Sequence, residues 1–304
     1  MNNRTMLEFF GLAMIWGVVF LFMRVGAPEF GPIALIEIRV LLAAAVLTPL
    51  VLKKQVRGIF IAEWRPILVI GLTNYAIPFC LLAYATLRLS SGFTSILNAT
   101  LPFTAALIGY WFWNERLTWT RVLGLVIGFI GVSIMIWGRE NLVFTGDGIS
   151  ILACLLATTS YGYAANYSRS RAKHLPPLVL TAGSLWAAAV MLAPLALVYW
   201  PQTQPSAIAW SAAVALALLS TAYAFVLYYR LIATIGAGRT VLVTFLIPIF
   251  ASFWGVVLLH ESIDTPMLVG GATILLGVAL ATGAIGQSLV FPKLSFMTKA
   301  QPKK

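Results

Sequence analysis

The sequence predicts an all-α integral membrane protein with ten transmembrane helices, arranged as two inverted five-helix repeats, and with both termini in the cytoplasm. Three observations support this prediction. The apolar segments are long and unbroken, marker residues recur about half a chain apart, and the basic residues gather in alternate connections.

The composition excludes an ordinary water-soluble domain. The chain has 304 residues, of which 61% are hydrophobic and 10% are charged, and its mean hydropathy is +0.94. A soluble domain carries about 25% charged residues, whereas unbroken apolar runs of about 20 residues are typical of membrane helices. A transmembrane β-barrel is excluded because its strands alternate apolar and polar residues.

Five spans are expected in the first half of the chain. The first apolar run is about 20 residues long, enough to cross a bilayer. We interpret it as a retained helix because Pro28 disfavours signal-peptide cleavage directly before it. Pro32 and Pro66 mark the starts of the second and third spans, since proline suits the first turn of a helix. The expected spans are 7–26, 33–52, 66–87, 92–113 and 119–137.

Five more spans are expected in the second half. Asp147 and Asp264 are suitable N-cap residues before the sixth and tenth spans, and prolines mark many of the other boundaries. The expected spans are 148–168, 177–199, 207–230, 239–259 and 266–287. We assign residues 1–138 to a first repeat, 147–288 to a second repeat and 289–304 to a basic cytoplasmic tail.

Marker residues show that the two halves are related. Trp16, Gly17, Pro32 and Pro49 recur 145 residues later as Tyr161, Gly162, Pro177 and Pro194. Pro102, Glu115, Gly124 and Gly131 recur 146 residues later as Pro248, Glu261, Gly270 and Gly277. A repeat with an odd number of spans places its second copy upside down. Inverted repeats of this kind are typical of secondary transporters, which hold the substrate where the halves meet.

The basic residues indicate the orientation. With a cytoplasmic N-terminus, the outer segments hold only Arg88 and Arg139 among the Lys and Arg residues. The other Lys and Arg residues outside the spans or within a turn of their ends, apart from Arg24, lie on the inner side: Arg4, Lys53, Lys54, Arg57, Arg65, Arg116, Arg121, Arg169, Arg171, Lys173, Arg230, Arg239, Lys293, Lys299, Lys303 and Lys304. Cytoplasmic loops carry this excess in membrane proteins. The net charge of +11 therefore reflects topology, and no nucleic-acid partner is expected.

These residues also carry a family resemblance, which extends over residues 7–287. The chain resembles the ten-helix members of the drug/metabolite transporter superfamily that are built from two EamA-type repeats. The resemblance implies an exporter of small metabolites, including amino acids and aromatic ones among them. The second half departs from the pattern, since Tyr161 replaces the tryptophan and Ser184 stands opposite Arg39. The matching residues are Trp16, Gly17, Phe20, Pro32, Arg39, Leu101, Pro102, Asn114, Glu115, Arg116, Leu117, Gly124, Gly128, Gly131, Ile247, Pro248, His260, Glu261, Ser262, Ile263, Gly270 and Gly277.

Polar and aromatic side chains within the spans are the candidate substrate contacts. Polar groups are costly in a bilayer unless they face protein or water, and aromatic walls with a few polar groups suit amphipathic solutes. The alternative is packing, with hydrogen bonds between helices that are each worth about 1 kcal/mol. The candidates are Trp16, Asn74, Tyr75, Tyr84, Asn98, Tyr163, Asn166, Trp186, Tyr223 and Thr244.

Three prolines within spans are candidate hinges, namely Pro78, Pro102 and Pro248. Each frees a backbone carbonyl and favours a kink, which an alternating gate would use. A static packing bend is the alternative.

Glu37 and Arg39 are charged residues inside the second span, and two positions along a helix do not face each other. Glu37 is a candidate for proton coupling or for contact with a substrate amino group, and Arg39 is a second candidate coupling residue. The alternative places both near the outer interface, paired with Arg24 or reaching water. Glu115 and Glu261 lie on opposite sides in the predicted topology, so we interpret them as charges at helix starts.

Neither an enzyme nor a cofactor is expected. Two distant histidines, two cysteines within spans and no acidic cluster give no pattern of a metal site or a nucleophile triad, and the sequence has no Walker-type loop. The favoured function is secondary export of aromatic or hydrophobic amino acids across the cell inner membrane by alternating access. A multidrug, nucleoside or sugar-type carrier is the alternative, with a channel or scaffold third. We expect a small-molecule substrate, a lipid bilayer and, as one open possibility, a monomer.

Overall fold

A computed structural model describes residues 3–51, 54–137 and 147–284. Within these ranges all regular secondary structure is helical, which confirms the all-α class. Eight helices are long and apolar enough to cross a membrane, and Thr265–Ala281 is a shorter apolar helix. The predicted tail 289–304 lies outside the described residues.

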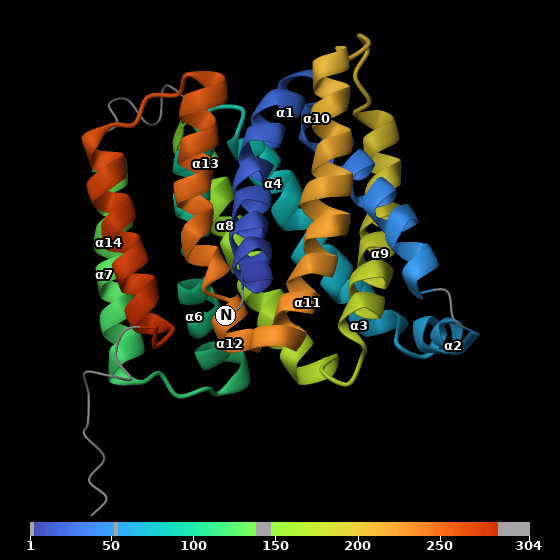
Figure 1. Cartoon of the computed structure of the whole chain (residues 1–304), viewed down its shortest axis with the longest axis horizontal. Coiled ribbons are helices and arrows are strands. Elements are labelled where there is room, and N and C mark those ends of the chain that lie inside the picture. Colours follow the sequence, from blue (N-terminus) through green and yellow to red (C-terminus); the bar gives the residue numbers. More distant parts are fainter. Residues whose placement is uncertain (1–2, 52–53, 138–146, 285–304) are drawn as a thin grey trace, which may run out of the picture.

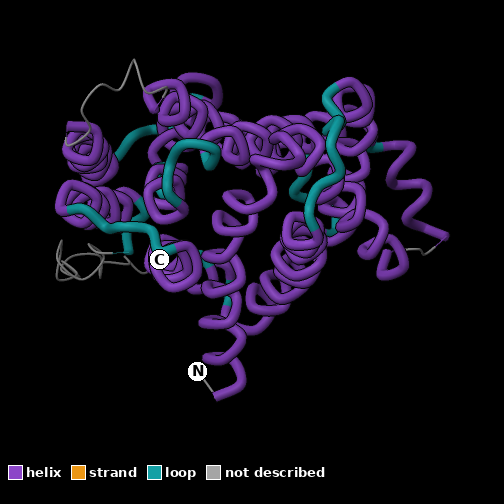
Figure 2. Tube along the Cα trace, turned by 90° about the horizontal axis from the view of Figure 1, so that it is seen from above, coloured by secondary structure: helices purple, strands orange, loops and turns teal. Residues whose placement is uncertain are grey.

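Most of the long helices run side by side along one direction, while the short α2 and α12 lie across it (Figure 1), and Figure 2 views many of the long helices nearly end on. They are α1 (Asn3–Val51), α2 (Lys54–Ala62), α3 (Trp64–Ile70), α4 (Ile77–Ala85), α5 (Ser91–Asn98), α6 (Leu101–Trp113), α7 (Trp119–Trp137), α8 (Asp147–Arg171), α9 (Pro177–Val198), α10 (Ala207–Ala217), α11 (Ala224–Ile235), α12 (Ala237–Thr240), α13 (Val243–Leu259) and α14 (Thr265–Ala281). Two π-helical segments, η1 (Gly71–Ala76) and η2 (Leu218–Tyr223), join α3 to α4 and α10 to α11.

The helix α1 is two arms joined at Gly31. This residue has φ 73° and ψ 156°, a backbone conformation that glycine adopts without steric cost. Pro32 follows it and begins the second arm. The arms run over residues 3–30 and 32–51, so one 49-residue element holds nearly all of the predicted spans 7–26 and 33–52, and the first arm continues four residues past its predicted end.

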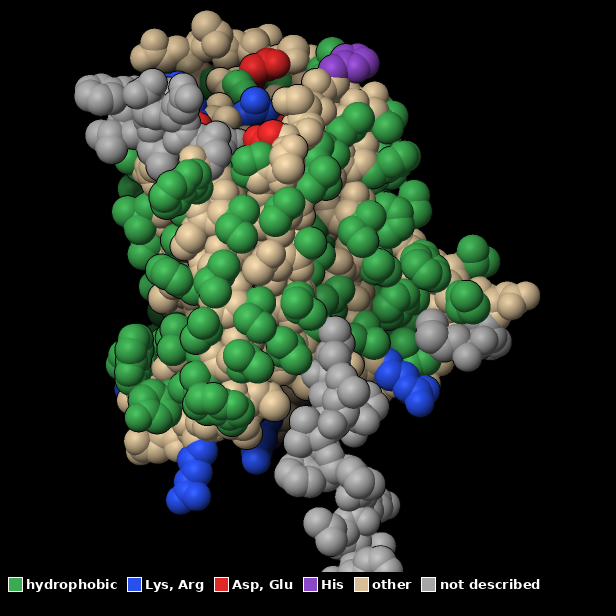
Figure 3. All heavy atoms as spheres, turned by 90° about the vertical axis from the view of Figure 1, so that its left-hand side faces the viewer, with side chains coloured by type: hydrophobic (Ala, Val, Ile, Leu, Met, Phe, Trp, Pro, Cys, Tyr) green, Lys and Arg blue, Asp and Glu red, His purple; other side chains and the backbone are tan. Residues whose placement is uncertain are grey.

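The surface is that of a membrane protein. Figure 3 shows hydrophobic side chains over the face formed by α7 and α14, with basic groups at one end and acidic, basic and histidine groups at the other. Large apolar side chains such as Phe129 (74% exposed) and Leu268 (60% exposed) lie on this face. Lipid is the solvent that such a surface requires.

Glycines bring α7 and α14 into backbone contact. A Cβ on Gly124 would lie 2.5 Å from the carbonyl oxygen of Gly277, and one on Gly131 would lie 2.8 Å from that of Gly270. Small residues permit this close approach of helices in membranes. The pairing is reciprocal, because Gly124 corresponds to Gly270 and Gly131 to Gly277 in the repeat. The two helices therefore meet through the same marker positions.

A second pair of matching contacts joins α1 to α13 and α8 to α6. A Cβ on Gly17 would lie 2.6 Å from Cβ of Phe250. Its counterpart Gly162 would have a Cβ 2.7 Å from the backbone nitrogen of Ala105 and 2.9 Å from the carbonyl carbon of Thr104. Thr104 is 146 residues before Phe250, so the first arm of α1 packs on α13 as α8 packs on α6.

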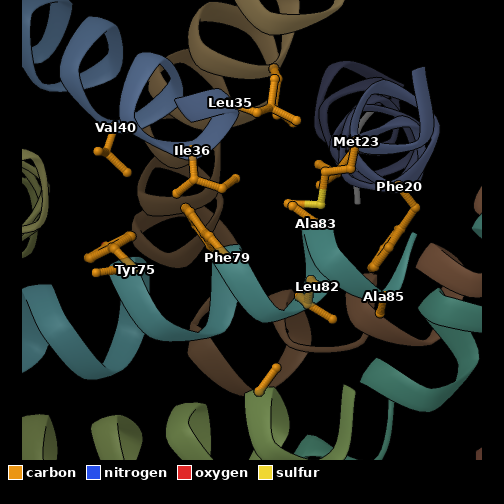
Figure 4. Close-up of a cluster of buried hydrophobic side chains, with 14 of the residues drawn as sticks. Phe20, Met23, Leu35, Ile36, Val40, Tyr75, Phe79, Leu82, Ala83 and Ala85 are labelled. Atoms are coloured by element: carbon orange, nitrogen blue, oxygen red, sulfur yellow. The ribbon is translucent and has the colours of Figure 1, made fainter. Parts of the chain in front are cut away.

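The core lies between the two arms of α1 and the η1–α4 segment. Figure 4 shows Tyr75 and Phe79 near Ile36 and Val40 of the second arm. In the same view Leu82 lies nearer the first arm. This packing holds the second arm against the middle of the third span.

The fourth and ninth spans are interrupted. Between α5 and α6 the chain turns at Ala99–Thr100, and Pro102 stands in the first turn of α6. Between α12 and α13 it turns at Val241–Leu242, whereas Pro248 lies inside α13. Pro78 stands in the first turn of α4, directly after η1. Two of the three candidate hinge prolines thus adjoin an irregularity of their helix.

Candidate functional site

A central cavity of about 310 Å³ lies among the spans of both halves. Seven of its lining side chains are aromatic, and their rings touch: the centroid of Trp16 lies 5.1 Å from that of Tyr228, and that of Tyr75 lies 5.9 Å from that of Phe225. Aromatic walls of this kind bury apolar parts of a small solute. The lining is Trp16, Val19, Phe20, Met23, Arg39, Asn74, Tyr75, Phe79, Leu82, Asn98, Leu101, Tyr161, Phe225, Tyr228 and Ile247.

Arg39 is the charged residue of this lining. Its side chain is buried, with the residue only 4% exposed, and its Nε donates to the hydroxyl of Thr221 at 2.9 Å. The guanidinium carbon lies 3.5 Å from the ring centroid of Phe79, a cation–π contact. The second arm of α1 therefore delivers a positive charge to the cavity wall.

Glu37 points elsewhere. It is two residues before Arg39 on the same arm, so the two side chains leave the helix on different faces. Glu37 is 8% exposed and lines neither of the two cavities described here. Arg24 does not pair with it, because Arg24 instead donates to the carbonyls of Thr86 and Leu89 and lies 3.7 Å from Glu261.

The π-helical segments shape the cavity. Asn74 and Tyr75 belong to η1 and line the wall, while Thr221 of η2 receives the hydrogen bond of Arg39. The two segments stand at matching positions of the repeats. A π-helical turn rotates the following residues relative to an α-helix and is frequent at functional sites.

A wider cavity of about 840 Å³, which we call the vestibule, adjoins the central cavity. Asn74, Tyr75 and Tyr228 line both cavities, so the two lie next to each other at these residues. The vestibule extends to the end of the molecule where α12 and the α6–α7 connection lie (Figure 1). Its charged lining residues are Glu115, Arg121, Arg169 and Lys173.

The opposite end is held together by Glu261. Its carboxylate accepts hydrogen bonds from the backbone N–H of Ser91 at 2.9 and 3.0 Å and from the Ser91 hydroxyl at 3.1 Å. Ser91 is the first residue of α5, where free N–H groups favour a negative charge. With Arg24 on its other side, Glu261 joins α1, α5 and the α13–α14 connection.

At the vestibule end, Glu115 has a different set of partners. Arg169 makes an ion pair with Glu115 and a hydrogen bond to the Asn166 amide oxygen, while the Asn166 amide nitrogen donates to the carbonyls of Ala105 and Gly162. This network joins α8 to α6 and its following turn. Among the residues that the structure describes, no three His, Cys, Asp or Glu side chains gather as metal ligands.

Four of the predicted substrate contacts line the central cavity, namely Trp16, Asn74, Tyr75 and Asn98. Asn166 and the hinge candidate Pro102 line the vestibule. The other five line neither cavity. Tyr163 packs beside Tyr167 and Trp113, Tyr84 and Tyr223 are 40% and 54% exposed, Trp186 donates to Thr48, and Thr244 donates to the carbonyl of Val241.

Five aromatic lining residues were not among the predicted contacts: Phe20, Phe79, Tyr161, Phe225 and Tyr228. A signal existed for Tyr161, because it is the repeat counterpart of Trp16 and both face the same cavity. Phe225 and Tyr228 are three residues apart and share a helix face. Phe20 is among the residues that carry the family resemblance, whereas nothing in the sequence separates Phe79 from an ordinary packing residue.

Comparison with known proteins gives a consistent picture. The model of the EamA-like transporter family matches residues 3–137 and again 148–283. An uncharacterized transporter, YoaV of Bacillus subtilis, is 27% identical over 286 residues, covering 92% of this chain and 97% of the relative. A probable terminal-alkyne amino-acid exporter of Streptantibioticus cattleyicolor is 27% identical over 267 residues, covering 87% and 89%.

Two further likenesses extend this picture. An S-adenosylmethionine/S-adenosylhomocysteine transporter of Chlamydia trachomatis is 25% identical over 281 residues, covering 88% of this chain and 86% of the relative. A solved crystal structure superposes with a TM-score of 0.61 at 19% identity and covers 93% of this chain and 98% of its own, which shows a shared fold.

Proposed function

The chain belongs to the EamA-like transporter family, and from this premise we propose that it exports small amphipathic metabolites by alternating access. Aromatic and other hydrophobic amino acids are the favoured substrates. The protein works in the cell inner membrane with both termini in the cytoplasm, and ten spans form two inverted repeats. In this orientation the vestibule faces the cytoplasm and Glu261 lies on the outer side.

The reciprocal glycine contacts support the inverted repeats. Gly124 meets Gly277 as Gly131 meets Gly270, and Gly17 meets Phe250 as Gly162 meets Thr104. An interface in which each contact recurs with the partners exchanged is what a two-fold axis generates. An axis in the membrane plane relates the halves of many carriers.

The proposed mechanism rests on a difference in packing between Gly92 and its repeat counterpart Gly238. On the outer side Gly92 is packed so closely that a Cβ there would lie 2.5 Å from the hydroxyl oxygen of Ser252 and 2.5 Å from Cε of Met267. Its counterpart Gly238, on the inner side, has nothing within 4 Å of such a Cβ. The same junction is therefore closed at one end of the molecule and open at the other.

The vestibule lies where this contact is missing. Ser252 and Met267 correspond to Ala106 and Arg121, and both of these line the vestibule, as does Ala237 beside Gly238. Gly92 touches Ser252 and Met267 on the outer side. On the inner side, the vestibule separates their counterparts Gly238, Ala106 and Arg121. A two-state carrier built from inverted repeats exchanges these two arrangements.

The acidic residues after α6 and α13 act as latches in this mechanism. Glu261 holds Ser91 at the start of α5, and Arg24 lies beside it. Their counterparts are Glu115, Ala237 and Arg169, the last being 145 residues after Arg24. Glu115 and Arg169 are already paired. Closing the inner side therefore requires the start of α12 to move onto Glu115, while the contact between Glu261 and Ser91 breaks on the outer side.

The cavity supports the substrate class. Seven aromatic rings and a few polar groups enclose about 310 Å³, within the range of small-molecule sites. A relative is described as an amino-acid exporter, which favours amino acids, whereas another is described as a transporter of S-adenosylmethionine and S-adenosylhomocysteine. A multidrug, nucleoside or sugar-type solute is the alternative substrate within the same mechanism.

Cysteine cross-linking tests the exchange of the two arrangements. Ala106→Cys and Gly238→Cys are introduced together after Cys80 and Cys154 are replaced by alanine, and a thiol cross-linker of short span is added to the protein in liposomes. We expect the pair to cross-link only while the inner side is closed, and the cross-link to abolish solute exchange until it is reduced. Each single-cysteine variant is the control.

Two results would contradict alternating access. One is full transport by protein in which the pair is completely cross-linked. The other is failure of the pair to cross-link under conditions where the same reconstituted protein transports solute.

A further inference from the structure

We propose that Arg39 binds the carboxylate of the transported solute inside the central cavity. This inference rests on the proposed transport function and names the recognition chemistry of its site. Among the described residues, four observations lead to it: the burial of the guanidinium, the incomplete use of its donors, the absence of an acidic neighbour in the cavity wall, and the nature of the remaining lining.

The guanidinium has donor capacity to spare. Nε donates to Thr221 and the π-face rests on Phe79. Nη1, however, is buried and has no hydrogen-bond partner among the described residues. A buried polar group without a partner is unfavourable, and more so when it carries a charge. A ligand that supplies an acceptor at this atom would relieve that cost.

No acidic side chain stands in the central cavity wall described here, so the positive charge of Arg39 is not neutralised there. The ion pairs found among the described residues lie at Glu8, Glu63, Glu115 and Glu261, away from it. An uncompensated buried cation favours an anionic ligand. A planar carboxylate matches the fork of donors on arginine.

Asn98 supplies a complementary group. Its amide oxygen is buried without a hydrogen-bond partner in the described structure, and its side chain lines the same cavity. An amide oxygen accepts from an ammonium group. A solute with a carboxylate, an ammonium and an apolar or aromatic side chain therefore finds a partner for each part: Arg39, Asn98 and the aromatic wall.

Thr221 and Phe79 position the guanidinium. The hydrogen bond from Nε to Thr221 spans 182 residues of sequence and links the second arm of α1 to η2. Since the two elements belong to different halves, the carboxylate site is built at the junction that moves during transport. Ser184, the repeat counterpart of Arg39, carries no charge. The carboxylate therefore binds at one side of the cavity only, which fixes the orientation of the solute.

Matched ligands test the proposal directly. Binding to purified protein in detergent is measured for three amino acids and their decarboxylated amines: phenylalanine and phenethylamine, tryptophan and tryptamine, leucine and isoamylamine. Phenylacetate is added as a carboxylic acid without the ammonium group. We expect the wild type to bind each amino acid about 10- to 100-fold more tightly than its amine, the effect of hydrogen bonds to a charged group.

The variants distinguish recognition from a structural role. Arg39→Gln should reduce the ratio of amino-acid to amine affinity to about one while leaving amine binding in place, and Arg39→Lys should restore part of the ratio. A merely structural arginine would lower both affinities together and leave the ratio unchanged. Arg230→Gln is the control, because Arg230 pairs with Glu8 and lines neither cavity.

The binding results distinguish an error in the role of Arg39 from an error in the proposed substrate class. Equal binding of acid and amine by the wild type would overturn the role of Arg39 and leave the transport proposal intact. Binding of none of the amino acids, amines or phenylacetate by folded protein would contradict both the carboxylate site and the amino-acid substrate class. An unchanged ratio in Arg39→Gln would overturn the role of Arg39 alone.

Discussion

The carboxylate of Glu261 accepts both the backbone N–H and the hydroxyl of Ser91, at distances from 2.9 to 3.1 Å. This contact closes one end of the molecule by joining the α13–α14 connection to the first turn of α5. Its repeat counterpart would join Glu115 to Ala237, and the vestibule lies between them instead.

Glu261→Gln should open the outer side. The substitution removes the charge that the start of α5 and Arg24 both favour, so the outward-open population should rise about tenfold or more. Met23 is fully buried in the central cavity wall, and Met23→Cys reports on access. Labelling of this cysteine by an impermeant maleimide from outside should be faster by the same factor. An unchanged labelling rate would contradict the latch.

Glu115→Gln should have the opposite effect. In the proposed mechanism Glu115 is needed to close the inner side, so the variant should remain inward-open. Labelling of Met23→Cys from outside should then be slower than in the parent, and exchange of solute should fall. Faster external labelling in this variant would show that the two acids are not counterparts in the mechanism.

Gly131→Ala should destabilise the packing of α7 on α14. The added Cβ would lie 2.7 Å from the backbone nitrogen of Ile274 and 2.8 Å from the carbonyl oxygen of Gly270, and backbone cannot move aside as a flexible side chain can. We expect a loss of about 1–3 kcal/mol in the free energy of unfolding, measured as a lower thermal midpoint in detergent. Gly11→Ala is the control, since a Cβ there has nothing within 4 Å.

Much of this fold follows from sequence reasoning, because helix length and proline position are local properties. The apolar runs locate nearly every helix, and the repeat offset identifies Gly124, Gly131, Gly270 and Gly277, which meet in the structure. The break near Gly31 is also predicted, because Pro28 and Pro32 separate the spans 7–26 and 33–52, whereas the continuation of the first helix through Pro28 and Glu29 is not. The π-helical segments are not predictable from periodicity, because a single inserted residue per turn leaves little trace in an apolar run.

The site is predicted only in part. In-span polar residues point to Asn74 and Asn98, which line the central cavity. Sequence does not separate the aromatic residues that line the central cavity from those that do not. Trp16 and Tyr84 both lie in the middle of a predicted span, yet Trp16 lines the central cavity and Tyr84 does not. Which helix face meets a cavity depends on the tertiary arrangement of both repeats, and one span alone does not contain that information.

Asn98→Ala and Tyr163→Ala separate the two outcomes of sequence reasoning. Sequence alone predicts that either change abolishes transport without preventing membrane insertion. The structure places Asn98 in the central cavity and Tyr163 against Tyr167 and Trp113. We therefore expect Asn98→Ala to lower uptake at least tenfold and Tyr163→Ala to lower it less, with equal amounts of both proteins in the membrane. The reverse order would contradict the cavity assignment.

Uptake into liposomes tests whether this protein transports amino acids. Purified protein is reconstituted and given labelled phenylalanine, tryptophan, leucine, an adenosine nucleoside and a hexose, each with and without a pH gradient. We expect saturable uptake of the amino acids, unchanged by the gradient and retained in Glu37→Gln, because Glu37 lines neither cavity. Stimulation by the gradient that is lost in Glu37→Gln would make this residue a coupling group. Uptake of the nucleoside or hexose without any amino acid, by protein shown to be folded, would contradict the claim.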